Sequence, residues 1–181
     1  MKILPLSIEG AFEVRLDRLG DRRGYFGRVY CEDTFAAHRL NTRWVQANIS
    51  YTQAKGTVRG LHFQRPPAAE VKMVRAIRGR AHDVLVDLRA GSSTFGQCCT
   101  VDLDADAKNA VYIPTGCAHG FQTLCDDVEL HYSHSHVYAP EYEGGVHPQD
   151  TALRHQWPLP VVQLSDRDQA LPLLADCEPI Q

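Results

Sequence analysis

The strongest constraint on the fold is a succession of short segments rich in β-branched and aromatic residues, with little helical periodicity between them. Turn signals built from Gly, Pro and Asp separate these segments, for example RGR at 78–80 and PTG at 114–116. Many short strands at close spacing favour a sandwich or barrel, and a jelly roll fits the pattern best. The predicted strands cover 71–77, 81–88, 98–103, 110–113, 120–124 and 128–138.

Helical patterns occur only outside this run of strands. One short helix is predicted around 32–40, with Asp33 or Thr34 as its N-cap, and a second near 166–175. A length of 181 residues without internal repeats fits one domain, so we expect residues 1–181 to form a single domain. The predicted class is therefore all-β with short peripheral helices.

The composition is that of an ordinary soluble globular protein, with 44% hydrophobic and 23% charged residues. The formal net charge of −3 gives no bulk attraction for nucleic acid or a membrane, although a few local cations could still bind a phosphorylated substrate. The N-terminal apolar run is broken by Pro5, and no apolar stretch reaches about 18 residues. We therefore expect a cytoplasmic protein.

The six cysteines contain no Cys-x-x-Cys spacing. Cys98 and Cys99 are adjacent, and neighbouring residues of a strand point to opposite faces. We therefore expect reduced, small apolar residues rather than a disulfide framework.

Two segments concentrate polar residues that a strand could direct into a barrel. The first reads GTVRGLHFQ at 56–64, and the second reads IPTGCAHGF at 113–121. Because side chains alternate along a strand, His62 and Gln64 should share one face. If that face points inward, four polar residues could surround an anionic or oxygen-rich ligand: Arg59, His62, Gln64 and Lys72.

These two segments resemble the paired motifs of the cupin superfamily. The second histidine of the first cupin motif is replaced here by Gln64, which leaves the metal-ligand set incomplete. A metal-dependent cupin, a dioxygenase or isomerase using His62, Glu70 and His119, stays open as an alternative. So does a non-catalytic barrel that binds a sugar nucleotide, in which the histidines are structural.

A longer series of matching strings narrows the resemblance. The strings are DRRGYF at 21–26, QANIS at 46–50, VRGLHFQ at 58–64, KMVR at 72–75, DVLVDLR at 83–89, STFG at 93–96, IPTGCAHGF at 113–121 and QWP at 156–158. In this order they resemble the dTDP-4-dehydrorhamnose 3,5-epimerase family, a metal-free branch of the cupins, over roughly residues 10–175. The resemblance implies a cupin-type jelly-roll barrel and an isomerase without a cofactor.

The same resemblance implies the chemistry and its residues. The substrate would be a nucleotide-linked 4-keto-6-deoxyhexose, inverted at C3, at C5 or at both. His62 corresponds to the base, and histidine is well suited to that task near neutral pH. Asp168 corresponds to the carboxylate that orients it, Lys72 to the cation near the enolate oxygen, and Tyr132 to the proton donor on the opposite face.

Substrate binding and assembly are also implied by the resemblance. Tyr138 would stack on thymine, and Arg59 would grip the diphosphate. The family forms homodimers in which an N-terminal segment, here with Arg23 and Phe26, enters the neighbour's site. The positions implied to bind substrate are Arg23, Phe26, Gln46, Asn48, Arg59, His119, Tyr138, Glu143 and Arg167.

The chain departs from the family pattern at several positions. Arg28 stands where a glutamate is usual, which replaces an acceptor by a donor. The loop at 146–150 reads VHPQD, and the stretch at 131–136 is rich in histidine. His134 and His136 suggest a metal site, but we expect them to be exposed or hydrogen-bonded polar residues. Because Arg28 and this loop correspond to positions near the nucleotide, the identity of the nucleotide and of the sugar stays open.

Overall fold

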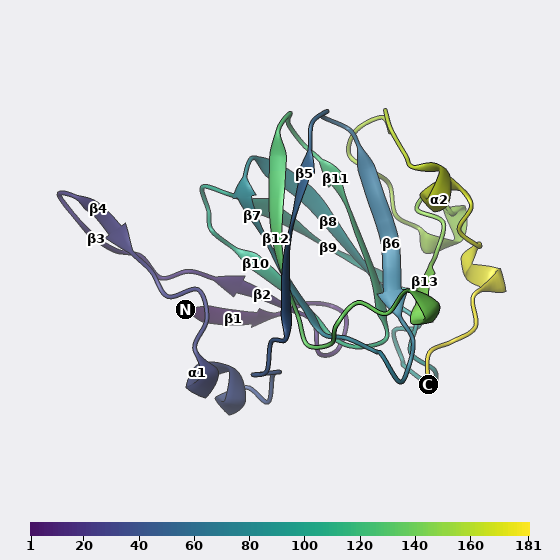
Figure 1. Ribbon diagram of the computed structural model, residues 1–181, viewed down its shortest axis with the longest axis horizontal. Coiled ribbons are helices and arrows are strands. Elements are labelled where there is room, and N and C mark those ends of the chain that lie inside the picture. The colour runs from purple at the N-terminus through teal and green to yellow at the C-terminus, as the bar shows by residue number, and fades with distance from the viewer.

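Two antiparallel sheets pack face to face in the computed structural model, which describes residues 1–181 (Figure 1). The six-stranded sheet runs in the order β1 (Lys2–Pro5), β2 (Phe12–Arg15), β10 (Ala110–Ile113), β7 (Lys72–Arg78), β12 (Val128–His134) and β5 (Gln46–Thr52). The five-stranded sheet runs in the order β13 (Glu143–Gly145), β6 (Val58–Gln64), β11 (Cys117–Thr123), β8 (Arg80–Asp87) and β9 (Cys98–Asp104). The predicted all-β architecture is confirmed.

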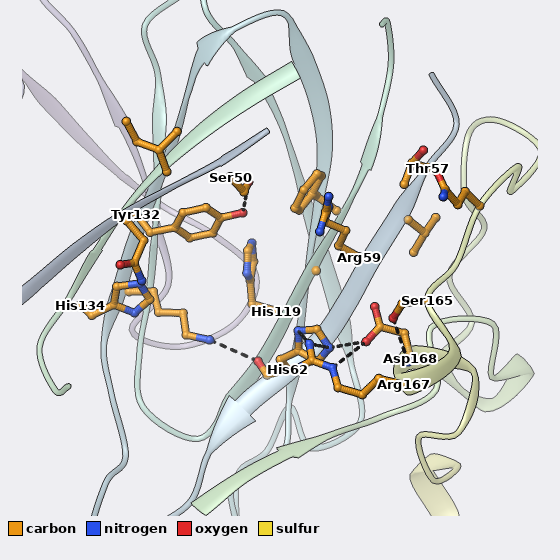
Figure 2. Close-up of a pocket in the computed structure, with 17 residues that line it drawn as sticks. Ser50, Thr57, Arg59, His62, His119, Tyr132, His134, Ser165, Arg167 and Asp168 are labelled. Atoms are coloured by element: carbon orange, nitrogen blue, oxygen red, sulfur yellow. Dashed lines mark hydrogen bonds and ion pairs between the residues drawn. The ribbon is translucent and has the colours of Figure 1, made fainter. Parts of the chain in front are cut away.

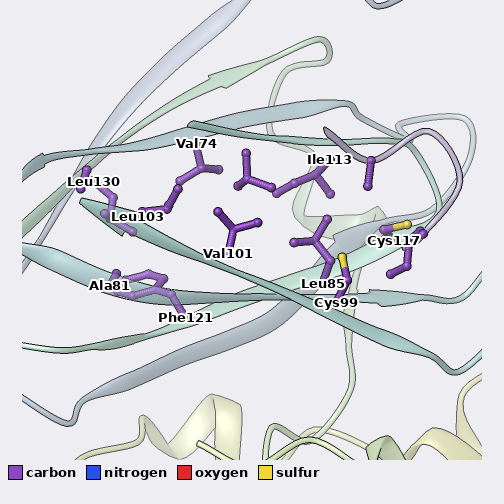
Figure 3. Close-up of a cluster of buried hydrophobic side chains, with 14 of the residues drawn as sticks. Val74, Ala81, Leu85, Cys99, Val101, Leu103, Ile113, Cys117, Phe121 and Leu130 are labelled. Carbon is purple, nitrogen blue, oxygen red and sulfur yellow. The ribbon is translucent and has the colours of Figure 1, made fainter. Parts of the chain in front are cut away.

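A sixteen-residue apolar core lies between the sheets and holds them together (Figure 3). Every second residue of β9 is buried, so that Val101 and Leu103 point inward while their neighbours face away. Cys99 is buried on this inner face and Cys98 lies on the other, as the alternation predicted. All six cysteines are free thiols.

The helices lie outside the sheets and are shorter than predicted. They are α1 (Glu32–Ala37), α2 (Asp166–Gln169) and the 3-10 turns η1 (Pro140–Tyr142), η2 (Thr151–Leu153) and η3 (Leu174–Asp176). The prediction of Asp33 or Thr34 as the N-cap of α1 was wrong, because the extended residue before the helix is Cys31. Asp33 lies in the first turn instead, where a negative charge favours the helix dipole.

The C-terminal segment, residues 146–181, covers the outer face of the five-stranded sheet. Leu61 and Phe63 of β6 pack there against Val146, Leu153 and other apolar residues of this segment. The packing carries α2 to the open edge of the sandwich, beside β6 (Figure 1). None of the helices combines the length and the apolar character that a membrane-spanning helix needs.

The N-terminal hairpin is the one part that extends away from the two sheets. It consists of β3 (Leu19–Asp21) and β4 (Gly24–Phe26), which pair only with each other (Figure 1). Next along the chain, α1 is fixed to the six-stranded sheet by edge-to-face contacts of Phe35 with Tyr30, Trp44 and Tyr112. The hairpin thus projects from a firmly packed base.

Candidate active site

A cavity of about 610 Å³ opens between the two sheets at the β5, β6 and α2 side (Figure 2). Its wall combines side chains of both sheets with residues of the C-terminal segment. The sequence-predicted residues that line it are Asn48, Arg59, His62, Lys72, His119, Tyr132, Arg167 and Asp168. All four predicted catalytic residues therefore share one cavity.

A bulge in β6 lets Arg59 and His62 face this cavity together, although strict alternation would place them on opposite faces. His62 pairs with His119 of β11 and Arg59 with Phe121, and the register shifts between them. Gly60 lies in the bulge with φ +120°, and a Cβ there would sit 2.5 Å from the Cα of Gly120. Only glycine tolerates both conditions.

His62 is held by a buried carboxylate of α2. His62 Nε2 lies 2.7 Å from Asp168 Oδ1, and Asp168 Oδ2 accepts the Gly60 N–H at 3.2 Å. Burial raises the pKa of Asp168, but its hydrogen bonds with His62 and Gly60, together with the charge of Arg167, outweigh this and hold the pKa below its usual range. An ionised Asp168 accepts a hydrogen bond from the Nε2–H of His62, which leaves the lone pair of Nδ1 free to act as a base.

Arg167 lies over His62 at the rim of the cavity. Its Nη2 is 2.9 Å from Nε2 and 3.4 Å from Nδ1 of the imidazole, while its Nη1 donates to Glu143 at 3.2 Å. Glu143 in turn accepts a hydrogen bond from the Tyr138 hydroxyl at 2.9 Å. Glu143 and Tyr138 therefore belong to the rim of the cavity rather than its wall.

Tyr132 lies on the wall opposite the His62–Asp168 pair (Figure 2). Its hydroxyl is 3.1 Å from Ser50 Oγ, and its ring stacks on His134 and meets the edge of His119. Burial raises the pKa of Tyr132, so the phenol is protonated at neutral pH. The Lys72 ammonium donates to the main-chain oxygen of His62 at 3.5 Å and pairs with Glu70 at 3.2 Å.

Asp83 is a site residue that the sequence analysis did not single out. It is fully buried on β8 and lies 2.7 Å from His119 Nε2, behind the cavity wall. Burial raises the pKa of Asp83, while the neighbouring His119 opposes this shift. The available signal was an acidic residue directly before the apolar run 84–86 of β8, because a buried carboxylate requires a partner.

Gln64 does not belong to the cavity, contrary to the prediction that it would surround a ligand with His62. Its amide donates to Ala68 O at 2.9 Å and accepts the Ala139 N–H at 2.7 Å. Those main-chain groups need partners in the interior, and the Gln64 amide satisfies them.

The residues of the metal alternative do not fit a metal ion. His62 is engaged with Asp168, Glu70 with Lys72 and His134, and His119 with Asp83. No three His, Cys, Asp or Glu side chains are arranged to hold a metal. His134 is buried and bonded to Glu70, and His136 lies beyond the end of β12 with its Nδ1 2.8 Å from Val137 O.

The remaining predicted binding residues lie outside the cavity of this chain. Arg23 and Phe26 sit on the projecting hairpin, where Arg23 pairs with Asp21. Gln46 accepts the Tyr138 N–H at 2.9 Å, which places both residues on the same rim.

Comparison with known proteins assigns this arrangement to a family. The sequence profile of dTDP-4-dehydrorhamnose 3,5-epimerase matches residues 5–176. The chain belongs to this family. It is 42% identical to the dTDP-4-dehydrorhamnose 3-epimerase of Streptomyces niveus, over 97% of this chain and 85% of the relative.

Two solved structures of such epimerases share the fold. The dTDP-4-dehydrorhamnose 3,5-epimerase of Elizabethkingia anophelis has a TM-score of 0.93 at 36% identity, with 97% of each chain covered. The dTDP-6-deoxy-D-glucose-3,5-epimerase of Legionella pneumophila, in complex with dTDP-4-keto-L-rhamnose, has a TM-score of 0.91 at 36% identity, covering 98% of this chain and 94% of that one. The predicted cupin-type jelly-roll barrel is thus confirmed, and membership favours an epimerase over a metal-dependent cupin.

Proposed function

We propose that this chain is an isomerase that epimerises a nucleotide-linked 4-keto-6-deoxyhexose, such as dTDP-4-dehydro-6-deoxyglucose, at C3, C5 or both. The observation that carries the proposal is the placement of His62, braced by ionised Asp168, across one cavity from protonated Tyr132. A base and an acid on opposite walls are what inversion of a carbon centre requires. Family membership supports the same reaction.

The ketone at C4 makes the neighbouring C–H bonds acidic. His62 Nδ1 takes the proton from C3 or C5, and the electron pair of that bond moves to the ketone oxygen to form an enolate. The Lys72 ammonium stabilises the negative oxygen, a contribution of about 3–4 kcal/mol for a preorganised donor. Tyr132 then delivers its phenolic proton to the carbon from the opposite face, and solvent exchange returns His62 and Tyr132 to their starting states.

Cations at the mouth of the cavity are suited to the nucleotide diphosphate. Arg59 is fixed by donating to Thr52 Oγ1 at 2.9 Å and to Tyr51 O at 3.1 Å. The rest of its guanidinium edge can bind phosphate oxygens together with Arg167. Tyr138, which is 53% exposed at the rim, offers its ring to the base.

The proposal is tested by incubating the protein with dTDP-4-keto-6-deoxyglucose in deuterated water. We expect deuterium at C3, C5 or both, with the labelled positions identifying the centres that react. His62→Ala should abolish exchange, whereas Tyr132→Phe should keep some exchange and lose inversion. Absence of deuterium from the sugar with the unmodified protein would contradict the proposal and favour a non-catalytic binding barrel.

We also propose that the protein is a homodimer in which the hairpin completes the partner's site. Leu19 and Phe26 on the hairpin are 72% and 70% exposed, and edge strand β5 exposes Ile49 and Tyr51 by 63% and 49%. A second copy of the chain that covers this edge strand would bury the exposed apolar side chains and also shield the open strand edge, both of which otherwise favour aggregation. Arg23 and Phe26 would then reach the partner's cavity.

Two further proposals concern the chain as a whole. The six free thiols support a reducing compartment, for which we propose the cytoplasm. The core between the sheets draws on residues from Ile8 to Leu130, and the outer apolar cluster extends to Ile180. This continuity supports residues 1–181 as one domain.

A further inference from the structure

A continuous series of polar contacts runs along the Tyr132 wall of the cavity. The Lys72 ammonium lies 3.2 Å from Glu70 Oε1, and Glu70 Oε2 lies 2.7 Å from His134 Nδ1. His134 Nε2 lies 3.3 Å from Asn48 Nδ2 on the neighbouring strand β5. This series of contacts therefore links the Lys72 ammonium, beside His62, to the Asn48 amide on edge strand β5.

The direction of each hydrogen bond follows from the charge of Glu70. Burial raises the pKa of Glu70, but its hydrogen bonds with His134 and Lys72 and the charges of these two residues lower the pKa by more. The carboxylate is therefore ionised and only accepts hydrogen bonds. His134 therefore donates through Nδ1, and its Nε2 faces the nitrogen of the Asn48 amide, which is a donor, so Nε2 accepts. Asn48 then donates through Nδ2, which leaves its Oδ1 free.

We propose that His134 is a positioning residue that fixes the orientation of the Asn48 amide, so that Asn48 presents Oδ1 as an acceptor for an O–H or N–H group of the sugar nucleotide. This inference rests on the proposed function. Asn48 and His134 both line the cavity, and the His134 ring also stacks on Tyr132 with an interplanar angle of 16°. An amide free to rotate would offer its donor and acceptor ends in turn and would select substrate less well.

The contact set distinguishes this role from ordinary core packing. A histidine that only filled space would need no ionised partner, whereas His134 is 9% exposed and has a partner at each ring nitrogen. His136, two positions along the chain, contacts only a main-chain oxygen in the same histidine-rich stretch. His136 is therefore a matched control for His134.

The first test compares His134→Leu, His134→Gln and His136→Leu by steady-state kinetics with dTDP-4-keto-6-deoxyglucose. Leucine fills a similar volume without polar atoms, and we expect KM to rise about tenfold. This rise corresponds to about 1.4 kcal/mol, the size expected for one lost hydrogen bond. Glutamine can donate to Glu70 and accept from Asn48, so it should restore KM to within about threefold of the unmodified protein. His136→Leu should leave both kcat and KM unchanged.

The second test is a double-mutant cycle with Asn48→Ala. If His134 acts through Asn48, His134→Leu should raise KM in the unmodified background and have little further effect on KM in Asn48→Ala. Additive effects in the cycle, or a Gln variant as impaired as the Leu variant, would overturn the proposal. Thermal unfolding of each variant checks the fold.

Asn48→Ala by itself keeps the inference testable if His134→Leu fails to fold, because Asn48 is exposed on β5 and its removal leaves no cavity. An unchanged KM in Asn48→Ala would overturn the inference while leaving the proposed function intact. Lack of deuterium exchange with the unmodified protein would instead remove the proposed function on which the inference depends.

Discussion

The chemistry of His62 depends on the groups that hold its ring. Asp168 fixes one nitrogen, and the Gly60 N–H fixes Asp168 through its other oxygen. The N-cap Ser165 accepts the Asp168 N–H and so fixes the first turn of α2. The proposed base, His62, is therefore oriented by a short helix whose first turn is capped by one serine.

Replacing Asp168 by Asn tests this arrangement. The amide keeps the shape of the carboxylate but loses the charge that favours an imidazolium after proton transfer, so kcat should fall about 10²-fold or more, with KM little changed. Deuterium wash-in at the sugar carbons measures the effect. Asp166→Asn, an exposed neighbour on the same helix, is the control, and equal losses in the two variants would contradict the assigned role.

Asp87 contributes to stability rather than to catalysis. Its buried carboxylate accepts hydrogen bonds from Arg89, Ser92 and Thr94, which close the turn after β8. Burial raises the pKa of Asp87, but these hydrogen bonds together lower it far below its usual range. Since the folded-state pKa is depressed, the stabilisation is complete above the unfolded-state value of about 3.9 and is lost as pH falls below it.

Asp87→Asn should therefore lower the free energy of unfolding by about 2 kcal/mol at pH 7, because charge-assisted hydrogen bonds are lost. The difference from the unmodified protein should shrink as the pH falls below about 4. Urea unfolding at a series of pH values measures both quantities. A difference that stays constant down to pH 2 would show that the Asp87 charge does not carry the effect.

The sequence identified the residues of the candidate site more completely than the groups that form hydrogen bonds with them. His62 and Asp168 are 106 positions apart in the sequence, so no spacing rule joins them, and only the family resemblance placed Asp168 in the site. Gln64 has the polarity of a site residue, yet its amide hydrogen-bonds to main-chain groups of the nearby Ala68 and of the distant Ala139. Asp83 was missed because its role depends on which strand lies beside β8.

The bulge in β6 is the local feature that alternation could not predict. Predicted strands such as 110–113 coincide with the structure, since both ends of β10 are marked by turns. The bulge depends instead on close contact between β6 and β11, where a Cβ on Gly120 would lie 2.6 Å from Arg59 O. Pairing partners are a property of the folded sheet and not of either segment alone.

Gly120→Ala should separate β6 from β11 and displace Arg59 from its place in the cavity wall. We expect a loss of about 1–3 kcal/mol in the free energy of unfolding, as for other overpacked sites, together with reduced kcat/KM. Gly20→Ala is the control, because its Cβ would meet only Gly24 O at an ordinary 3.5 Å. Thermal unfolding and steady-state kinetics measure the two effects, and a Gly120 variant as stable and active as the control would contradict the argument.

At the scale of the whole molecule, the C-terminal segment completes the candidate active site by adding Arg167 and Asp168 to the cavity lined by the two sheets. It is tied to the five-stranded sheet by bridges of Thr57 with Gln163 and of Arg89 with Ile180. Asp168 and Arg167 therefore reach the cavity from a segment that belongs to neither sheet. The sequence predicted a short helix here, but the path of the segment is determined by its packing over Leu61 and Phe63.

The exposed hairpin leads to a prediction about assembly. An aromatic side chain that is 70% exposed on a projecting hairpin is well placed to anchor an interface, and buried aromatic anchors commonly contribute 2 kcal/mol or more. Phe26→Asp should therefore raise the dissociation constant of the proposed dimer about tenfold or more, as measured by sedimentation over a range of protein concentrations. Activity should fall with the dimer fraction, because Arg23 and Phe26 would be withdrawn from the partner's cavity.

The control for this variant is Leu173→Asp, which adds the same charge at a residue that is 48% exposed on the C-terminal segment, away from the hairpin. It should leave both the association and the activity unchanged. A Phe26→Asp protein that sediments like the unmodified protein at every concentration would refute a hairpin-mediated dimer. A monomer that kept full activity would instead show that each cavity is complete within one chain, and that the rim formed by Gln46, Tyr138 and Glu143 is sufficient for the nucleotide.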